Sequence, residues 1–360
     1  MKIKKITRKN LVTILIVVAA YALITAGDAL GIVSSVLSGQ LIPICAYIMM
    51  ALSLNLTVGV LGELSLGHAG FMSIGAFTGA TVSMSLTGAI GSDILRFIIA
   101  VVSGAVVAAL LGFLIGLPVL RLRGDYLAIV TLAFGEIIKS IVNCLYIGRD
   151  SAGLHFSLKS AEALGLADGG VVIVNGPMGA VGIKKLSTFT AGAVLVVLTL
   201  LVIFTLVDSR AGRAIMAIRD NRIAAESVGV PITKYKMMAF ITSAAIAGGA
   251  GVLYGLGFST VSAAKFNYNT SILVLLFVVL GGIGNMRGSV ISAALLTILP
   301  ELLREFRDYR MLVYAIVLIL VMIATNNRTV RLFISKCVGR VLSVFKRKPA
   351  KTEEGGVSDE

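Results

Sequence analysis

The chain has 360 residues, of which 57% are hydrophobic and only 14% are charged, and it contains 39 glycines. Soluble globular domains are usually about 45–50% apolar and about 25% charged, so this composition excludes them and indicates an integral membrane protein. The formal net charge of +14 is distributed over the ends of apolar runs. Nucleic-acid binding needs a basic face with base-reading or stacking residues, so we expect no nucleic-acid partner.

The chain begins with a basic segment, residues 1–10, which carries Lys2, Lys4, Lys5, Arg8 and Lys9 and no acidic residue. An apolar run follows directly. It is longer than the apolar part of a usual secretory signal, so we interpret it as a first membrane helix that stays in the protein, with cleavage within residues 1–27 as the alternative.

A bilayer core needs about 20 mostly apolar residues per helix. By this measure the chain predicts an all-α, polytopic membrane fold of about ten helices, with a transmembrane domain over residues 11–325. The predicted spans are Leu11–Gly27, Ile32–Val60, Leu64–Leu86, Ile94–Leu120, Tyr126–Tyr146, Leu186–Val207, Met237–Phe258, Ser271–Ile283, Ser289–Leu303 and Met311–Thr325. The stretch Ser271–Leu303 is interrupted by Gly281–Gly288, so it forms either two crossings or one broken helix whose freed backbone groups are satisfied inside the bundle.

Basic residues orient the predicted bundle, because Lys and Arg mark the cytoplasmic side of a membrane. The N-terminal segment, the central loop 208–236 and the tail 326–360 are all basic. We therefore expect a multi-pass protein of the plasma (inner) membrane, surrounded by lipid, with both termini in the cytoplasm. The loop 147–185 is nearly balanced in charge and is expected on the extracytoplasmic side.

Small residues recur at every fourth position in two of the spans. In membranes such ladders let helix backbones approach closely, and we expect them to be packing interfaces, with sliding surfaces of a moving transporter as the alternative. The two ladders are Gly104, Ala108, Gly112 and Gly116, and Ser243, Ala247, Gly251 and Gly255.

Polar residues inside spans are costly and tend to face the bundle interior or a water-filled path. Glu136 and Lys139 lie three residues apart on one helix face and can neutralise each other, either as a structural pair or as part of a pathway lining. His68 is expected to be a hydrogen-bonded interhelical residue, with a proton relay as the alternative.

Two glycine-rich interruptions resemble each other loosely, Gly59–His68 and Gly281–Gly288. Paired broken segments in the two halves of a transporter point to a midplane pathway. The polar residues that we assign to this predicted translocation path are Asn55, Glu63, Ser65, His68, Glu136 and Asn285.

The chain lacks the motifs of membrane-embedded or nucleotide-dependent catalysis. It has no phosphate-binding loop, no zinc motif, no nucleophile elbow and only two histidines. Its three cysteines, Cys45, Cys144 and Cys337, are far apart and form neither a disulfide framework nor a metal site. We therefore predict no enzyme activity, no catalytic residue and no metal site in this chain.

The central loop carries a helical pattern. From Arg210 to Val228 apolar residues recur among Arg, Asp and Glu with a break near Asp220, and Gly229 and Pro231 end the second helix. A short amphipathic helix of this kind can lie in the groove of a partner or on the lipid surface.

These residues also carry a family resemblance. Ile223–Gly229 looks like the E-A-A-x-x-x-G segment with which permeases of ABC importers dock on their ATPase, although Ile223 replaces the usual Glu. A longer set of motifs resembles the branched-chain amino acid permeases of the LivM type, from about Ala51 to Thr325. This set comprises Ala51–Leu56, Gly62–Phe71, Leu120–Leu132 (LRLRGDYLAIVTL, the most specific), Gly212–Gly229 and Gly281–Gly288.

The resemblance implies the ABC importer permease fold and a role in moving Leu, Ile or Val into the cell. It implies as partners two ABC ATPase subunits, a second homologous permease and an extracytoplasmic amino-acid-binding protein. ATP and magnesium would be used by the ATPase, and this chain would bind no cofactor. The residues that it assigns to ATPase coupling are Arg219, Ala224, Ala225, Glu226 and Gly229.

Two other functions stay open from the sequence. Related permeases carry urea or short amides, and nothing in the chain selects among these substrates. A self-sufficient secondary transporter would need Glu136, Lys139 or His68 to carry ions or protons.

Overall fold

The computed structural model describes residues 8–31, 35–122, 124–150, 153–166 and 170–303, with isolated positions between 309 and 319. Met1–Leu302 form one compact unit and Leu303–Glu360 a second. Every element below belongs to the first unit. Most of the predicted span Met311–Thr325, and all of the tail 326–360, lie outside the described residues.

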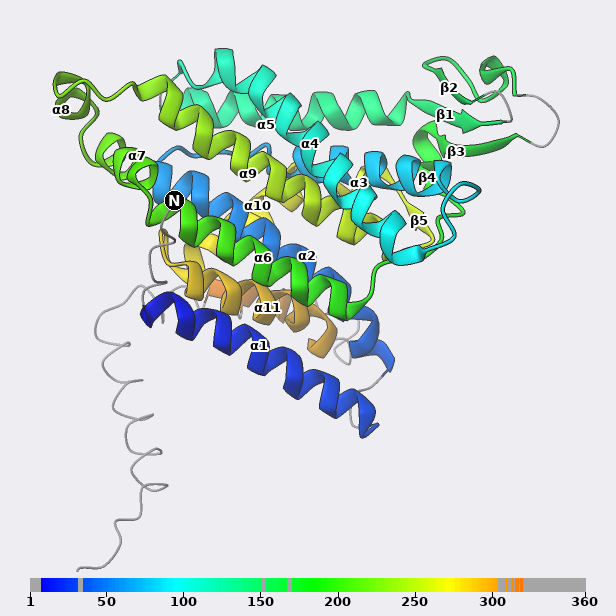
Figure 1. The fold of residues 1–360 in the computed structure, drawn as a ribbon, viewed down its shortest axis with the longest axis horizontal. Coiled ribbons are helices and arrows are strands. Elements are labelled where there is room, and N and C mark those ends of the chain that lie inside the picture. Colours follow the sequence, from blue (N-terminus) through cyan, green and yellow to red (C-terminus); the bar gives the residue numbers. More distant parts are fainter. Residues whose placement is uncertain are drawn as a thin grey trace, which may run out of the picture. The chain divides into compact units, whose positions relative to one another are not determined.

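Apolar helices form the bundle (Figure 1). They are α1 (Arg8–Ala29), α2 (Ser35–Asn55), α3 (His68–Ser85), α4 (Asp93–Val119), α5 (Asp125–Asn143), α6 (Phe189–Val207), α9 (Ile232–Gly255), α10 (Tyr268–Gly281) and α11 (Met286–Leu302). Each coincides with one of the predicted spans, so the helical membrane fold is confirmed.

The predicted number of ten crossings is not confirmed. Within the described part of the chain, six segments are long and apolar enough to cross a bilayer. These are Asn10–Asp28, Leu37–Leu61, Asp93–Val119, Phe189–Val207, Ile232–Gly255 and Ala263–Gly281.

The bundle has two distinct ends (Figure 1). At one end the helices α7 (Arg210–Asp220) and α8 (Arg222–Ser227) form a hairpin between α6 and α9. We call α7 and α8 the hairpin, and this end of the bundle the hairpin end. At the opposite end lies a small sheet, which defines the sheet end.

The sheet is antiparallel and has the strand order β2-β1-β3-β4-β5. Its strands are β1 (Tyr146–Arg149), β2 (Leu154–Ser157), β3 (Val171–Asn175), β4 (Ala180–Val181) and β5 (Thr260–Val261), and three short 3-10 turns accompany it at Glu162–Leu164, Gly176–Met178 and Ala263–Lys265. The sequence predicted an extracytoplasmic loop over 147–185 and no strands in it. Strands of two to five residues are too short to show an alternating pattern, which explains why the all-α prediction missed them.

The two small-residue ladders are packing interfaces. A Cβ atom on Gly104 of α4 would lie 2.3 Å from Cγ2 of Val252 in α9, and one on Gly251 of α9 would lie 2.0 Å from the carbonyl oxygen of Met72 in α3. Helix α9 therefore packs against both α3 and α4 at distances that only small residues allow. The predicted close approach of these helices is confirmed.

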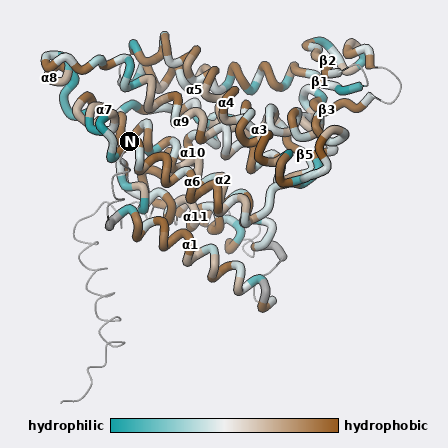
Figure 2. The backbone as a smooth tube through the Cα atoms, in the orientation of Figure 1, coloured by the Kyte–Doolittle hydropathy of each residue, from teal (hydrophilic) through white to brown (hydrophobic). Residues whose placement is uncertain are grey.

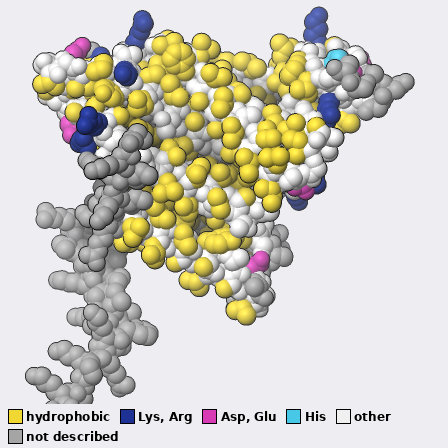
Figure 3. Space-filling view, in the orientation of Figure 1, with side chains coloured by type: hydrophobic (Ala, Val, Ile, Leu, Met, Phe, Trp, Pro, Cys, Tyr) yellow, Lys and Arg dark blue, Asp and Glu magenta, His cyan; other side chains and the backbone are white. Residues whose placement is uncertain are grey.

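The outer surface of the bundle is apolar between its two ends. Leu110 and Leu114 of α4 and Val194 of α6 are each 62% exposed. Figure 2 shows the most hydrophilic backbone at the hairpin and in the sheet, and Figure 3 shows hydrophobic side chains covering the visible face between them. A surface of this kind is stable in contact with lipid, whereas in water it would expose a large apolar area to solvent.

Candidate functional site

A hydrogen-bonded cluster lies in the interior, where α2, α3 and α9 meet. Its centre is Ser243, whose hydroxyl lies 2.7 Å from Nε2 of His68 and donates to the carbonyl of Ser53 at 2.8 Å. The hydroxyl of Thr57 donates to Ser243 at 2.8 Å, and Nδ1 of His68 lies 3.1 Å from the hydroxyl of Ser65. All five residues are buried.

His68 joins two other parts of the bundle through this cluster. Both of its ring nitrogens have a protein partner and its side chain is fully buried, as expected of an interhelical hydrogen-bonding residue. The sequence did not single out Ser243 as the centre. It stood out only as the first position of a small-residue ladder, and a single Ser at membrane depth gives no further signal.

Helix α2 breaks within the cluster, because Thr57 and Ser65 follow its last α-helical residue. Its α-helical part ends at Asn55, and Leu56–Leu61 form a π-helix that ends at Gly62 with a φ of +80°. The chain becomes helical again at His68, four residues later than the predicted span that begins at Leu64. We call Leu56–Gly67 the first break. π-Helical turns within α-helices are rare and frequent at functional sites.

The stretch Ser271–Leu303 forms two helices joined by a short link, and of these only α10 is among the described segments that are long and apolar enough to cross a bilayer. Helix α10 ends at Gly281 and α11 begins at Met286. The link Gly282–Asn285, which we call the second break, contains two glycines in the left-handed region, with φ of +92° at Gly282 and +80° at Gly284. The side chain of Asn285 is exposed and lies 3.4 Å from the carbonyl of Gly281.

The two breaks contact each other. The side-chain oxygen of Asn55 accepts from the backbone N–H of Gly284 at 2.8 Å, and its amide nitrogen donates to Ser289 at 2.8 Å. A Cβ atom on Gly59 would lie 2.3 Å from the backbone nitrogen of Gly284. The loose likeness of the two glycine segments in the sequence thus corresponds to direct contact in the structure. They meet near the hairpin end, because Gly59 also contacts α7.

The hairpin folds as its sequence predicts. The side chain of Ser209 caps α7 by accepting from Gly212, and that of Asn221 caps α8 by accepting from Ala224 at 3.0 Å. Gly229 follows α8 with a φ of +80°, so the predicted break near Asp220 and the predicted stop are both confirmed.

The predicted coupling residues face different ways. Ala225 is buried in a small core with Ile218 and Ile232, whereas Ala224, Glu226 and Gly229 are exposed. The two most exposed apolar side chains of the hairpin region are Ile223 and Val228, each 79% exposed. With Ala224 they form an exposed surface at the end of the hairpin. We call Ile223, Ala224 and Val228 the apolar tip.

Arg219 faces the bundle. Its Nη1 donates to the carbonyl of Gly59 at 2.9 Å, and its Nε and Nη2 contact the carboxylate of Asp220 at 3.0 and 2.8 Å. Its aliphatic stem covers Gly62, where a Cβ atom would lie 2.5 Å from Cγ of Arg219. The hairpin is therefore attached to the first break.

A buried ion pair makes a second attachment at the same place. Lys236 near the start of α9 pairs with Glu63 in the first break, and their side chains are only 5% and 14% exposed. Glu63 was assigned to the path from the sequence without a partner. Lys236 is 173 residues away along the chain, so no local pattern could reveal it.

Glu136 and Lys139 pair on α5, as the i,i+3 spacing predicts. The other carboxylate oxygen of Glu136 accepts from the backbone N–H of Tyr268 at 3.0 Å, so it also satisfies a free donor at the first turn of α10. Among the described residues, no hydrogen bond joins this pair to the cluster or to the breaks.

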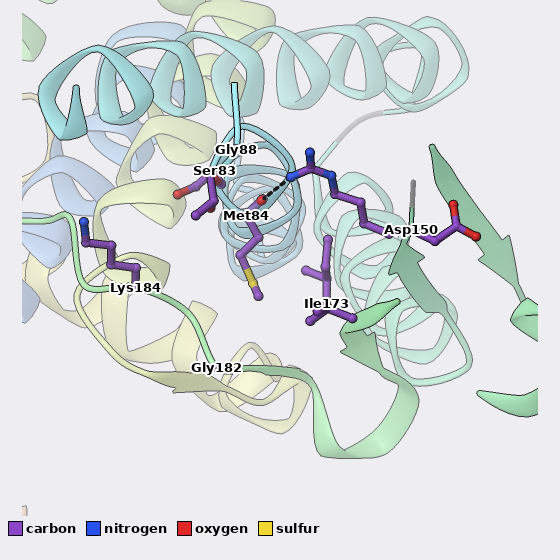
Figure 4. Close-up of a pocket in the computed structure, with 10 residues that line it drawn as sticks. Ser83, Met84, Gly88, Asp150, Ile173, Gly182 and Lys184 are labelled. Carbon is purple, nitrogen blue, oxygen red and sulfur yellow. Dashed lines mark hydrogen bonds between the residues drawn. The ribbon is translucent and has the colours of Figure 1, made fainter. Parts of the chain in front are cut away.

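A cavity of about 530 Å³ opens at the sheet end and has no counterpart in the sequence prediction (Figure 4). It is lined by the end of α3, by β1, β3 and by the segment that contains Gly182 and Lys184. Arg149 donates to the carbonyl of Met84 at 3.2 Å, and Lys184 pairs with Asp93 at 2.8 Å. Both cations therefore have partners at the cavity wall.

Comparison with known proteins shows the family to which the chain belongs. Residues 36–322 match the family model described as the permease component of a branched-chain amino acid transport system. The match includes the cluster, both breaks and the hairpin. No solved structure matches the chain.

Individual relatives carry the same description. The high-affinity branched-chain amino acid transport system permease proteins LivM of Salmonella typhimurium and Escherichia coli are each 37% identical over 292 residues, which cover 77% of this chain and 66% of theirs. A probable LivM protein of Methanocaldococcus jannaschii is 26% identical over 290 residues, 72% of this chain and 79% of its own. The chain thus spans slightly less than two thirds of the first two relatives.

Proposed function

The chain belongs to the branched-chain amino acid transport permease family, and on this premise we propose that it is the membrane permease subunit of an ABC importer that moves Leu, Ile or Val into the cell. The observation that carries the proposal is the hairpin. It presents an exposed apolar tip away from the bundle, while Arg219 ties its other side to the first break.

The apolar tip is suited to docking on an ATPase subunit. Ile223 and Val228 are 79% exposed, whereas the core formed by Ile218, Ala225 and Ile232 fixes the hairpin on α9. An amphipathic helix binds a partner by placing such apolar residues in a groove. In this proposal two ATPases bind and hydrolyse ATP with magnesium, and the permease itself binds no cofactor and catalyses no reaction.

The proposed path runs beside the cluster and the two breaks. Asn55, Ser65 and His68 lie in or next to this region, with Glu63 at its border. Rearranging the breaks would free backbone donors and acceptors, which a zwitterionic amino acid can bind. Asn285 contributes to the lining of the path at the second break. Glu136 has a structural role at α10.

The remaining partners follow from the same assignment. In this proposal the hairpin end faces the cytoplasm and the sheet end faces outward in the plasma (inner) membrane, with both termini in the cytoplasm. A second homologous permease completes the membrane part, and an extracytoplasmic amino-acid-binding protein delivers the substrate at the sheet end.

Two observations weigh against a self-sufficient secondary transporter. Glu136 is neutralised by Lys139 and also bonded to Tyr268, and His68 has partners at both ring nitrogens. Carriers of ions or protons need such groups to exchange with water.

The test is purification of the tagged chain from native membranes in mild detergent, identification of bound proteins by mass spectrometry, and uptake of radiolabelled Leu, Ile, Val, urea and acetamide in liposomes. We expect an ATPase and a second permease to co-purify, and ATP-dependent uptake of Leu, Ile and Val. Uptake by this chain alone without ATP would contradict the proposal of an ABC importer. ATP-dependent uptake of urea or acetamide, without uptake of Leu, Ile or Val, would show that the importer carries a different substrate.

A further inference from the structure

Arg219 connects the hairpin with the part of the bundle in which the helices are broken. The carbonyls in the last turn of a helix lack partners within the helix. The carbonyl of Gly59 lies in the last turn of the π-helix, three residues before its C-cap Gly62. Nη1 of Arg219 satisfies this carbonyl at 2.9 Å. Hydrogen bonds from a charged donor are about twice as strong as neutral ones, so this bond joins the hairpin directly to the backbone of the first break.

The contact continues from Gly59 to the second break. The peptide of Gly284 lies against Gly59, where a Cβ atom would come within 2.3 Å of its nitrogen. Asn55 of α2 holds the same peptide by accepting from its N–H at 2.8 Å. A displacement of the Gly59 carbonyl therefore changes the surroundings of Gly284 directly.

Two other attachments hold the hairpin and the start of α9. The core of Ile218, Ala225 and Ile232 joins α7, α8 and α9 by apolar packing. The pair of Lys236 with Glu63 fixes the start of α9 to the first break. On α7 itself, the side chain of Arg219 reaches a main-chain group of the first break.

We propose that Arg219 is the transmission residue of this permease: it passes movement of the hairpin to the Gly59 carbonyl, and through it to the second break at Gly284. This inference rests on the proposed function, because it presumes that an ATPase moves the hairpin. It makes Arg219 a positioning residue that works inside the permease, and separates it from the exposed apolar tip that docks on the ATPase.

The test uses the complete complex, with its ATPases and binding protein, in liposomes. Arg219→Met keeps the stem over Gly62 but removes the donors, and Arg219→Lys restores one donor. Arg213→Met is the matched control, because Arg213 lies on the same helix and donates at 3.4 Å to the nearby carbonyl of Asp208. Co-purified ATPase, ATP hydrolysis and substrate moved per ATP are measured for each.

For Arg219→Met we expect normal ATPase association and hydrolysis, with substrate moved per ATP reduced about tenfold, within the usual range of coupling between two sites. Arg219→Lys is expected to restore much of the loss, and Arg213→Met to behave as wild type. An unchanged ratio in Arg219→Met, or loss of the ATPase from that variant, overturns the inference. Absence of an ATPase from the wild-type complex would instead refute the proposed function.

Hydrogen exchange gives a second readout that does not depend on transport. In the wild-type complex we expect addition of ATP to change the exchange rate of the Gly284 amide, which Asn55 protects. Arg219→Met is expected to abolish this response and Arg213→Met to retain it. The same response in Arg219→Met would show that movement reaches the second break by another route.

Discussion

Ser243 shows how much a single hydroxyl can organise in a membrane bundle. It bonds to residues of α2, of the first break and of α3 from its place on α9. Interhelical hydrogen bonds in membranes are each worth about 0.6 kcal/mol on average and up to about 1.7. A hub with several such bonds is expected to contribute more, because its loss leaves buried polar groups without a partner.

We therefore expect Ser243→Ala to destabilise the protein by about 1–3 kcal/mol, the cost of unsatisfied buried polar groups. The measurement is thermal unfolding in detergent, in which size-exclusion chromatography reports how much folded protein remains after heating. Thr242→Val is the control, since the neighbouring hydroxyl donates to the carbonyl of Met238 within its own helix. Equal stability of the two variants would show that the cluster is not held by Ser243.

At the residue scale, separation along the chain decides what the sequence reveals. The pairing of Glu136 with Lys139 is predictable because three residues on a helix bring them to one face. The partners of His68 and Glu63 are not, since Ser243 and Lys236 are 175 and 173 residues away. The types of residue suggested the candidates, and only the fold supplied their contacts.

At the element scale, the hairpin separates residues that dock from residues that hold it together. Ala225 belongs to its core, and Val228 is exposed beside it. These neighbours in the chain should therefore respond differently to the same change.

We expect Val228→Asp to reduce the amount of co-purified ATPase at least about tenfold while thermal stability stays unchanged, because a charge at the centre of an apolar contact costs more than about 1.4 kcal/mol. Ala225→Asp is expected to lower both stability and association. Val171→Asp, at an exposed position of the sheet end, is the control and should change neither. Normal association of Val228→Asp would exclude the apolar tip as the docking surface.

The packing of α9 gives the most direct test of the small-residue ladder. Gly251 touches the backbone of α3, where a Cβ atom would lie 2.0 Å from the carbonyl oxygen of Met72, whereas one on Gly249 would meet nothing closer than 3.8 Å. Both positions lie on the same helix and gain equally in helix propensity on substitution by Ala.

Gly251→Ala is accordingly expected to reduce the folded yield, because overpacking of a tight contact costs about 1–3 kcal/mol. Gly249→Ala should fold as well as wild type. The readout is monodisperse protein recovered in detergent together with its melting temperature. Equal yields would mean that α9 and α3 separate without penalty.

For the whole molecule, hydrophobic length predicted the helical bundle well and the irregular parts poorly. Nine spans correspond to helices because runs of about 20 apolar residues have few alternatives in lipid. The π-helical turn after Asn55 was not predictable from the local sequence, and its Gly59 packs against Gly284, which lies far away along the chain in the second break. The sheet was missed because its strands are only two to five residues long, and because β5 pairs with a strand about 80 residues earlier in the chain, β4.

The orientation of the bundle is the property on which the functional proposal depends most. An ATPase can reach the hairpin only if the hairpin end faces the cytoplasm, and a binding protein can reach the sheet only from outside. The basic central loop favours this orientation, because Lys and Arg collect on the cytoplasmic side.

Single cysteines at the two ends decide the question. In a variant with Cys45, Cys144 and Cys337 replaced by Ala, Ile223→Cys marks the hairpin and Phe156→Cys marks the sheet, at positions 79% and 64% exposed. In right-side-out vesicles a maleimide that cannot cross membranes should label Phe156→Cys at once and Ile223→Cys only after permeabilisation. The reverse pattern would place the hairpin outside, where no ATP is available to drive it, and the importer mechanism would fail for this chain.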